Sequence, residues 1–310
     1  MNNLLLLFTV TLLSVNAFAQ EKLEYKESVK GYKSEKFMQS TDIHKPLESL
    51  EVGKKKQLVY SCDFSNKSSL DDWVMEGPGI SRINRGRLEL YSRYHKKVYR
   101  KMKRGKIVFE EGTSAWYQYY VEGLARKAEP KRYDDYLVGG VFRGGHIVYW
   151  NKFITPDNYV IEFDFQSPIP YPLHMIMFSA SGAGGESVFD GSLKPRCGVA
   201  AQYTKGDIYN YRISFLAPKR ATANMRKCPG RRLVTKGEDL TLSNPTGKHH
   251  IKVIRWNGQV EFRIDGKRVF LYLDGEKDAP LSSGNTAIRL MVPARGFYDN
   301  YQIYSLSNPR

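Results

Sequence analysis

The sequence predicts an all-β protein, a β-sandwich of two antiparallel sheets, on three observations. Short runs of alternating apolar and polar residues recur along the chain, turn residues separate these runs, and helical periodicity over ten or more residues is hard to find. Chains with many short strands, regular turns and few helices pack as two sheets around one core. With 310 residues and 41% apolar composition, the chain can fill such a core.

The N-terminal segment predicts export. Residues 4–15 form an apolar run, and Ala17-Phe18-Ala19 follows as an A-x-A cleavage site, so we interpret residues 1–19 as the signal peptide of a periplasmic or secreted protein. The run is too short to span a bilayer, and no later segment holds 18 uninterrupted apolar residues, so no membrane insertion is expected. Residues 20–57 are charged and poor in large apolar residues, which predicts a solvated arm.

The β-sandwich domain is expected over residues 58–310. In chain order its strand-like runs are GRLELYS (86–92), HIVYWNKF (146–153), YVIEFDFQ (159–166), HMIMFSA (174–180), YNYRISF (209–215), HHIKVIRW (249–256), QVEFRIDGKRVFLYL (259–273), AIRLMV (287–292) and YDNYQIYSL (298–306). Within residues 259–273, Asp265-Gly266 separates two alternating halves, and this dipeptide is the strongest short signal of a β-hairpin. Two stretches interrupt the rhythm: a basic insertion at about 93–145, and a Gly- and Ser-rich loop at 179–200.

The charge of the chain predicts a polyanionic partner. Lys and Arg outnumber Asp and Glu by 48 to 32, for a net charge of +16, and RYHKKVYRKMKRGK (93–106) holds eight of these cations. Export argues against nucleic acid, and Gly105 with the β-formers Val98 and Tyr99 argues against a basic helix lying on a membrane. Two interpretations remain: the insertion lines a groove and attracts an acidic glycan, or it is a solvated loop without a ligand.

The three cysteines do not have the spacing of a metal or redox site. Cys62, Cys197 and Cys228 are expected to be small buried residues with at most one disulfide, for which Cys197 and Cys228 are the candidate pair.

Five segments resemble the YesU-like family of bacterial proteins. They are DWVMEGPG, HIVYW, ESVFDGSLKPR, QYTKGDIYNYRISF and NMRKCPG. The resemblance covers about residues 57–308 and is interrupted at 93–145. It implies a concanavalin A-like lectin/glucanase jelly roll, a domain of unknown function, and a setting in bacterial breakdown of uronic-acid-containing polysaccharides.

In that fold the concave face of one sheet forms a groove for sugar chains. Side chains alternate along a strand, so Asn210, Arg212 and Ser214 form one row and are the candidates for the groove. A register slip of one residue would bring Tyr209 there instead.

The residue types in the resembling segments suit β-elimination on a uronate, by a lyase or a dehydratase. That reaction needs a base, an acid, and a cation or amide that holds the carboxylate while the enolate forms, and it requires no cofactor. We expect His146, His174 or Tyr209 to act as base or acid. The residues expected to bind an acidic oligosaccharide or polysaccharide are Arg196, Gln202, Asn210, Arg212, Arg226 and Trp150.

Two other functions stay open. A lectin-like module would bind sugar rings through aromatic side chains such as Trp150. A glycoside hydrolase would use Glu162 and Asp164 in EFDFQ, but Gln166 stands where a further glutamate is expected, and an amide cannot protonate a leaving group.

Jelly rolls of this kind often hold a structural calcium ion between the first and last strands. Asp63 and Asp299 are placed for such an ion, although no other metal motif supports it. The sugar, the linkage and the oligomeric state are not specified by the sequence.

Overall fold

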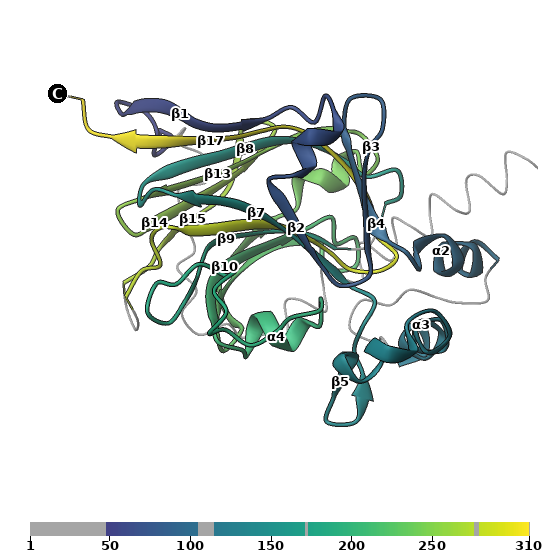
Figure 1. The fold of residues 1–310 in the computed structure, drawn as a ribbon. Coiled ribbons are helices and arrows are strands. Elements are labelled where there is room, and N and C mark those ends of the chain that lie inside the picture. The colour runs from purple at the N-terminus through teal and green to yellow at the C-terminus, as the bar shows by residue number, and fades with distance from the viewer. Residues whose placement is uncertain (1–47, 105–114, 171–172, 276–278, 310) are drawn as a thin grey trace, which may run out of the picture. The chain divides into compact units, whose positions relative to one another are not determined.

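Two antiparallel sheets face each other across an apolar core and form the predicted sandwich (Figure 1). The computed structural model describes residues 48–104, 115–170, 173–275 and 279–309, so the predicted signal peptide and residues 20–47 of the arm lie outside the described residues. The described residues belong to one compact unit, Asp42–Arg310. Within them, no helix is long and apolar enough to cross a bilayer.

Sheet A has eight strands in the order β15-β14-β13-β8-β17-β4-β3, with β1 paired to β17. Its strands are β1 (Lys55–Cys62), β3 (Gly79–Ile83), β4 (Leu88–Ser92), β8 (Tyr159–Gln166), β13 (Lys248–Trp256), β14 (Gln259–Ile264), β15 (Lys267–Leu273) and β17 (Arg295–Ser307). The predicted hairpin is confirmed: Asp265 and Gly266 connect β14 to β15 with φ values of 52° and 75°, which a tight hairpin turn requires.

Sheet B has seven strands in the order β12-β11-β10-β9-β16-β7-β2. They are β2 (Trp73–Glu76), β7 (Ile147–Thr155), β9 (His174–Gly182), β10 (Ile208–Phe215), β11 (Thr222–Cys228), β12 (Arg232–Glu238) and β16 (Gly284–Leu290). A small hairpin joins β5 (Leu137–Val138) to β6 (Val141–Phe142), and the 3-10 turns are η1 (Lys67–Leu70), η2 (Pro130–Arg132), η3 (Asp134–Tyr136) and η4 (Leu240–Ser243). We call the face of each sheet that points away from the other sheet its outer face.

The core between the sheets is built from alternate residues of each strand. On β8, Ile161, Phe163 and Phe165 point inward, while Glu162 and Asp164 lie on the outer face of sheet A. Aromatic rings fill the centre; the centroids of Phe163 and Tyr301, for example, are 5.6 Å apart. Each buried aromatic ring of this kind stabilises the fold by roughly 2–3 kcal/mol.

The insertion contains helices that the sequence analysis did not predict. These are α2 (His95–Lys103) and α3 (Ala115–Ala128), which lie together at one end of the sandwich beyond β4 (Figure 1). The argument against a helix at 93–106 is therefore corrected. Tyr94, Val98 and Met102 recur every four residues and form an apolar stripe, and long basic side chains are good helix formers, so the β-formers in the segment did not decide its structure.

A second, smaller core holds the insertion together. Val98 of α2 and Val121 of α3 are buried there with Cys197, Val199 and Val292 from the sandwich. Because these partners are distant in sequence, the insertion is fastened to the loop that follows β9 and to the end of β16.

The loop after β9 folds back over the outer face of sheet B and ends in α4 (Ala200–Thr204), which lies against β10 (Figure 1). Its side chains Val188, Leu193 and Tyr203 cover Trp150 of β7 and Met177 of β9. Part of the outer face that was predicted to be an open groove is therefore filled by the chain itself.

The end of the N-terminal arm is bound to the fold. The backbone N–H of Leu50 donates to Glu261 (2.8 Å), Arg268 donates to the carbonyl of Glu48 (2.6 Å), and Glu51 forms an ion pair with Lys252 (2.8 Å). Residues 48–54 thus lie on the outer face of sheet A, and only the part before residue 48 lies outside the described residues.

The cysteines are all free and buried. The candidate pair Cys197 and Cys228 is not bridged; the Cys197 thiol instead donates to the carbonyl of Asp135 (3.1 Å).

Candidate functional site

The outer face of sheet B carries the row that the alternation of β10 predicted. Tyr211, Ile213 and Phe215 are buried in the core, and Asn210 and Arg212 point to the opposite side. Arg212 lies beside Arg226 of β11 and Met177 of β9 in the strand register. The sequence therefore placed the correct row of this strand on the outer face.

Arg212 has an unusual environment for a cation. Its residue is only 6% exposed, and within the described part of the chain its guanidinium makes no hydrogen bond and no ion pair. Burial lowers its pKa to about 9, and three neighbouring arginines add to the shift. These neighbours are Arg289, Arg231 and Arg226. At neutral pH the guanidinium is therefore charged, nearly buried and without a counter-ion.

The surrounding groups do not neutralise Arg212. Arg226 donates to the backbone carbonyl of Arg231 (2.9 Å), and the described ion pairs put no carboxylate on either residue. Arg289 donates to the carbonyl of Gly198 (3.3 Å), and its guanidinium carbon is 5.0 Å from the ring centroid of Tyr203. Burial raises the pKa of the Cys228 thiol, so this neighbour is uncharged at neutral pH. We call Arg212, Arg226, Arg231 and Arg289 the arginine cluster.

His146 lies next to the arginine cluster but cannot act as a strong base. It is 4% exposed, and burial, followed by the charge of Arg289, lowers its pKa to about 3. The backbone N–H of Val292 donates to Nδ1 (3.2 Å), which assigns the remaining proton to Nε2. A neutral His146 is therefore a hydrogen-bond donor at Nε2.

His174 is in the core, which corrects its predicted place in the groove. The strand HMIMFSA turns His174, Ile176 and Phe178 inward. Nδ1 of His174 lies 2.8 Å from the hydroxyl of Tyr298, and the ring centroid is 4.7 Å from that of Phe165. Because every residue near His174 in this strand is apolar, the sequence offered no sign of which row faces the core.

Tyr209 is the one predicted acid or base that solvent reaches, at 37% exposed. It lies at the start of β10, opposite Ser181 of β9, whereas His174 pairs with Phe215 at the other end of the same strand. Six residues of strand span about 20 Å, so the structure does not bring the predicted catalytic residues together.

Three of the predicted binding residues instead hold the loop and α4 in place, which is a correction. Arg196 forms an ion pair with Glu76 (3.0 Å) and donates to the carbonyl of Val188. The side-chain oxygen of Gln202 accepts from the backbone N–H groups of Cys197 (2.9 Å) and Val199 (3.2 Å). Trp150 is fully buried beneath the loop, so its ring is closed to stacking with a sugar.

One end of the Asn210 side chain is used in a hydrogen bond within the fold. Its amide nitrogen donates to the carbonyl of Tyr203 (3.0 Å), and its buried side-chain oxygen has no partner within the described residues.

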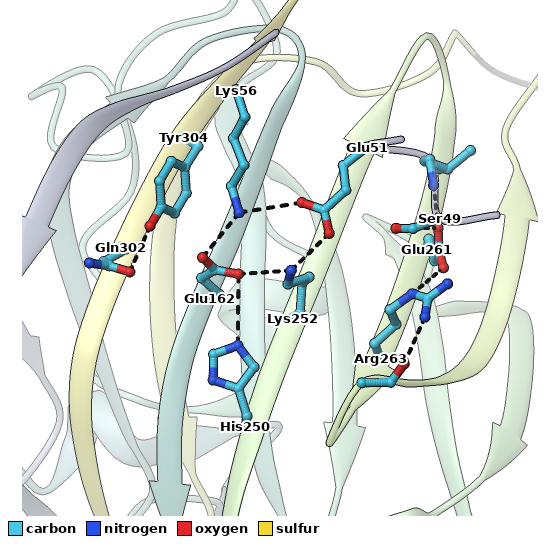
Figure 2. Close-up of polar contacts among 12 residues, drawn as sticks. Ser49, Glu51, Lys56, Glu162, His250, Lys252, Glu261, Arg263, Gln302 and Tyr304 are labelled. Carbon is cyan, nitrogen blue, oxygen red and sulfur yellow. Dashed lines mark hydrogen bonds and ion pairs between the residues drawn. The ribbon is translucent and has the colours of Figure 1, made fainter. Parts of the chain in front are cut away.

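The carboxylate pair considered for hydrolysis lies on the outer face of sheet A and is tied up in ion pairs. Figure 2 shows Glu162 between Lys56 (3.1 Å) and Lys252 (3.0 Å), with Nε2 of His250 at 3.7 Å. Burial alone would raise the pKa of Glu162, but the hydrogen bonds from His250 and Lys252 outweigh it and hold the pKa far below the usual range. A carboxyl group in this state cannot serve as a general acid.

Asp164 is held in the same way. It forms an ion pair with Lys248 (2.9 Å), and Nδ1 of His250 lies 3.2 Å away. A pocket of about 140 Å³ opens beside this network. Its lining residues are Ser49, Glu51, His250, Lys252, Arg263 and Gly266.

The described residues contain no group of three or more His, Cys, Asp or Glu side chains that could hold a metal ion. Asp63 is exposed and accepts from the backbone N–H of Ser65 (3.0 Å), and Asp299 lies opposite Asp164 on β17. A structural calcium ion stays a prediction.

Two members of the arginine cluster were not predicted. Arg289 stands alone as a charge in the apolar run AIRLMV, and this isolated charge was the available signal. Arg231 follows the turn after β11, where no periodic pattern assigns a face.

Comparison with known proteins places this site in a family. The model of the family described as domain of unknown function (DUF1961) matches residues 111–303. The chain belongs to the DUF1961 family. The predicted YesU-like membership is thereby confirmed, and because the DUF1961 match begins at residue 111, part of the insertion belongs to the family pattern as well.

One relative of this chain is the uncharacterized protein YesU of Bacillus subtilis. It is 33% identical over 171 residues, which are 51% of this chain and 77% of YesU. A solved structure from Bacillus subtilis, a protein of unknown function with a galectin-like fold, is 26% identical. It covers 83% of this chain and 100% of its own, with a TM-score of 0.61. The predicted jelly-roll fold is confirmed.

Proposed function

We propose that this chain is an exported carbohydrate-active protein of polysaccharide degradation that binds an acidic oligosaccharide at Arg212, through a carboxylate or sulfate group of the sugar. The observation that carries the proposal is a guanidinium that is nearly buried and has no counter-ion among the residues that the structure describes. Burying an uncompensated charge costs several kcal/mol, and a bound anion offsets that cost.

The chemistry of the cluster supports an oxyanion as the ligand. A guanidinium offers two parallel N–H donors that match a carboxylate or sulfate, and Arg226 across the register adds a second cation. The galectin-like sandwich of the solved relative supports a sugar as the carrier of that anion.

The reaction that fits such binding best is β-elimination. The arginine cluster would hold the uronate carboxylate as negative charge develops on it, and no metal or cofactor is needed. Tyr209 is our candidate acid or base because, of the three residues expected in that role, it is the one that solvent reaches. A lectin-like module with the same Arg212 contact is the alternative.

The test is titration calorimetry with uronate trisaccharides of pectic, alginate and sulfated algal types, comparing wild type with Arg212→Met. Methionine keeps an unbranched apolar stem and removes the charge, and we expect affinity to fall about 10- to 100-fold, the usual contribution of a charge-assisted hydrogen bond. The control is Arg85→Met, which makes the same charge change in an exposed turn between β3 and β4. Unchanged affinity in Arg212→Met would overturn the proposal.

Ultraviolet absorbance of the same mixtures separates catalysis from binding. A rising enol-carboxylate signal that Tyr209→Phe abolishes without loss of affinity would establish elimination. Binding without a signal for any sugar would establish the lectin-like module.

A further inference from the structure

The exposed side of α2 is a row of cations. Its other side is buried, with Val98 fully enclosed and His95 only 4% exposed. The helix contains no Asp or Glu, and its exposed basic residues are Lys96, Lys97, Arg100, Lys103 and the following Arg104. Successive turns, about 5.4 Å apart, each present one or two of these charges.

These cations have no acidic partners in the part of the chain that the structure describes. Within the described residues none of the five forms an ion pair, and Lys103 only lies over the ring of Tyr99, 5.4 Å from its centroid. Arg93, just before the helix, is different because it pairs with Glu129 (3.4 Å). A run of unpaired like charges on one helix repels itself, so binding of an anionic partner relieves that repulsion.

Two segments of the chain, residues 197–199 and Val292, contact both α2 and the region of the arginine cluster. Cys197 and Val199 pack in the small core that supports α2, and the carbonyl of Gly198 between them accepts from Arg289. Val292 likewise packs in that core, while its N–H donates to His146. The helix and the cluster therefore flank the same two segments of chain.

We propose that α2 is a second binding surface for the same polysaccharide chain. One acidic group of that chain binds at Arg212, and further acidic sugar residues bind along α2. The inference rests on the proposed function and adds a preference for polymers over short oligosaccharides. An acidic polysaccharide fits better than a membrane surface, because the apolar side chains of α2 face the protein and leave none to insert into lipid.

The test compares polygalacturonate with trigalacturonate as probes. In the fourfold variant Lys96→Gln, Lys97→Gln, Arg100→Gln and Arg104→Gln, we expect polymer affinity to fall roughly tenfold at low salt, since four exposed ion pairs each contribute about a factor of two. The salt dependence of polymer binding should flatten, and trisaccharide affinity should stay unchanged. The matched control carries Gln at Lys55, Lys67, Lys152 and Lys267, four exposed lysines elsewhere on the fold.

The outcomes separate the two proposals. If the α2 variant and the control bind the polymer equally, the second surface is refuted while Arg212 is untouched. If wild type binds polymer through α2 but never binds the trisaccharide, the proposed function fails and the helix surface stands. Tighter α2-dependent binding to anionic phospholipid vesicles or duplex DNA than to polygalacturonate would overturn the choice of partner.

Discussion

At the scale of single residues, the outer faces of the two sheets differ in how their charged side chains are paired. On sheet A every carboxylate of the Glu162 network meets cations at 2.8–3.7 Å. On sheet B, by contrast, no carboxylate of the described residues pairs with Arg212. A fold that neutralises one face and leaves a nearly buried cation on the other gives up stability at Arg212. This difference is the reason to look for a ligand on sheet B.

The sheet A network predicts a dependence of stability on pH. Because the pKa of Glu162 is lowered in the fold, its stabilising contribution is fully present above the unfolded pKa of about 4.3, decreases below that pH, and is lost only as pH falls through the lower folded pKa. We expect Glu162→Gln to lower the free energy of unfolding by about 1–2 kcal/mol at pH 7 and by less at pH 3, where the unfolded chain already binds the proton. Urea unfolding at pH 7, 5 and 3 measures this difference.

Glu238→Gln is the control, since Glu238 is exposed at the end of β12 and forms no ion pair within the described residues. A stability difference for Glu162→Gln that does not change with pH would show that the network adds nothing through charge.

The sequence predicts which side of a strand a residue faces only where one row of side chains is polar and the other apolar. In YNYRISF the polar row marked Arg212 correctly. In HMIMFSA both rows are apolar, so the sequence could not tell which row faces the core. The tertiary structure turns the row of His174 inward. Arg196 and Gln202 were chosen for their chemistry, but their partners, such as Glu76, are fixed by how the loop folds back.

At the scale of elements, the close approach of three segments sets the position of the loop beside Arg289 of the arginine cluster. Gly198 has φ of 90°, and a Cβ there would lie 2.2 Å from the backbone oxygen of His146. Gly77, with φ of 91°, would bring a Cβ 2.4 Å from the same oxygen. Only glycines allow the end of β2, the start of β7 and the loop to meet here.

Gly198→Ala should therefore lower the free energy of unfolding by about 2–4 kcal/mol, because it combines an unfavourable φ with a backbone clash. Trisaccharide affinity should fall as well, since the carbonyl of Gly198 positions Arg289. Gly191→Ala, in the same loop, has open space around the new Cβ and should match wild type. Equal denaturation midpoints for the two variants would contradict this account.

A strand or helix was predictable from its local sequence pattern when the tertiary structure around it favours the same conformation. The β14–β15 hairpin follows from its turn residues and alternation. The helix α2 was missed because Val98 and Tyr99 favour strands as single residues. Its apolar stripe is buried by residues distant in sequence, such as Val292, which the local pattern does not show.

At the scale of the whole molecule, the sandwich is closed by packing and not by disulfides. Burial raises the pKa of all three thiols, and each cysteine is at most 6% exposed. We expect no reaction with Ellman's reagent in the native protein, three thiols after unfolding, and an unchanged melting temperature in dithiothreitol. A single reactive thiol after unfolding would instead indicate one disulfide.

The fold class and family of the molecule were predictable because strand alternation and long sequence segments extend over most of the chain. The contact between the insertion and residues 197–199 was not, because it joins parts of the chain about a hundred residues apart through a few small side chains.

The ends of the folded unit lie on sheet A. β1 pairs with β17, residues 48–54 cross the outer face of that sheet, and the side chain of Lys54 donates to Asn308 (3.2 Å). Sheet B is built only from internal strands. A solid support attached at residue 48 or residue 309 would thus lie on the sheet A side, so the protein could be displayed on a sensor chip with the Arg212 face turned toward passing glycans.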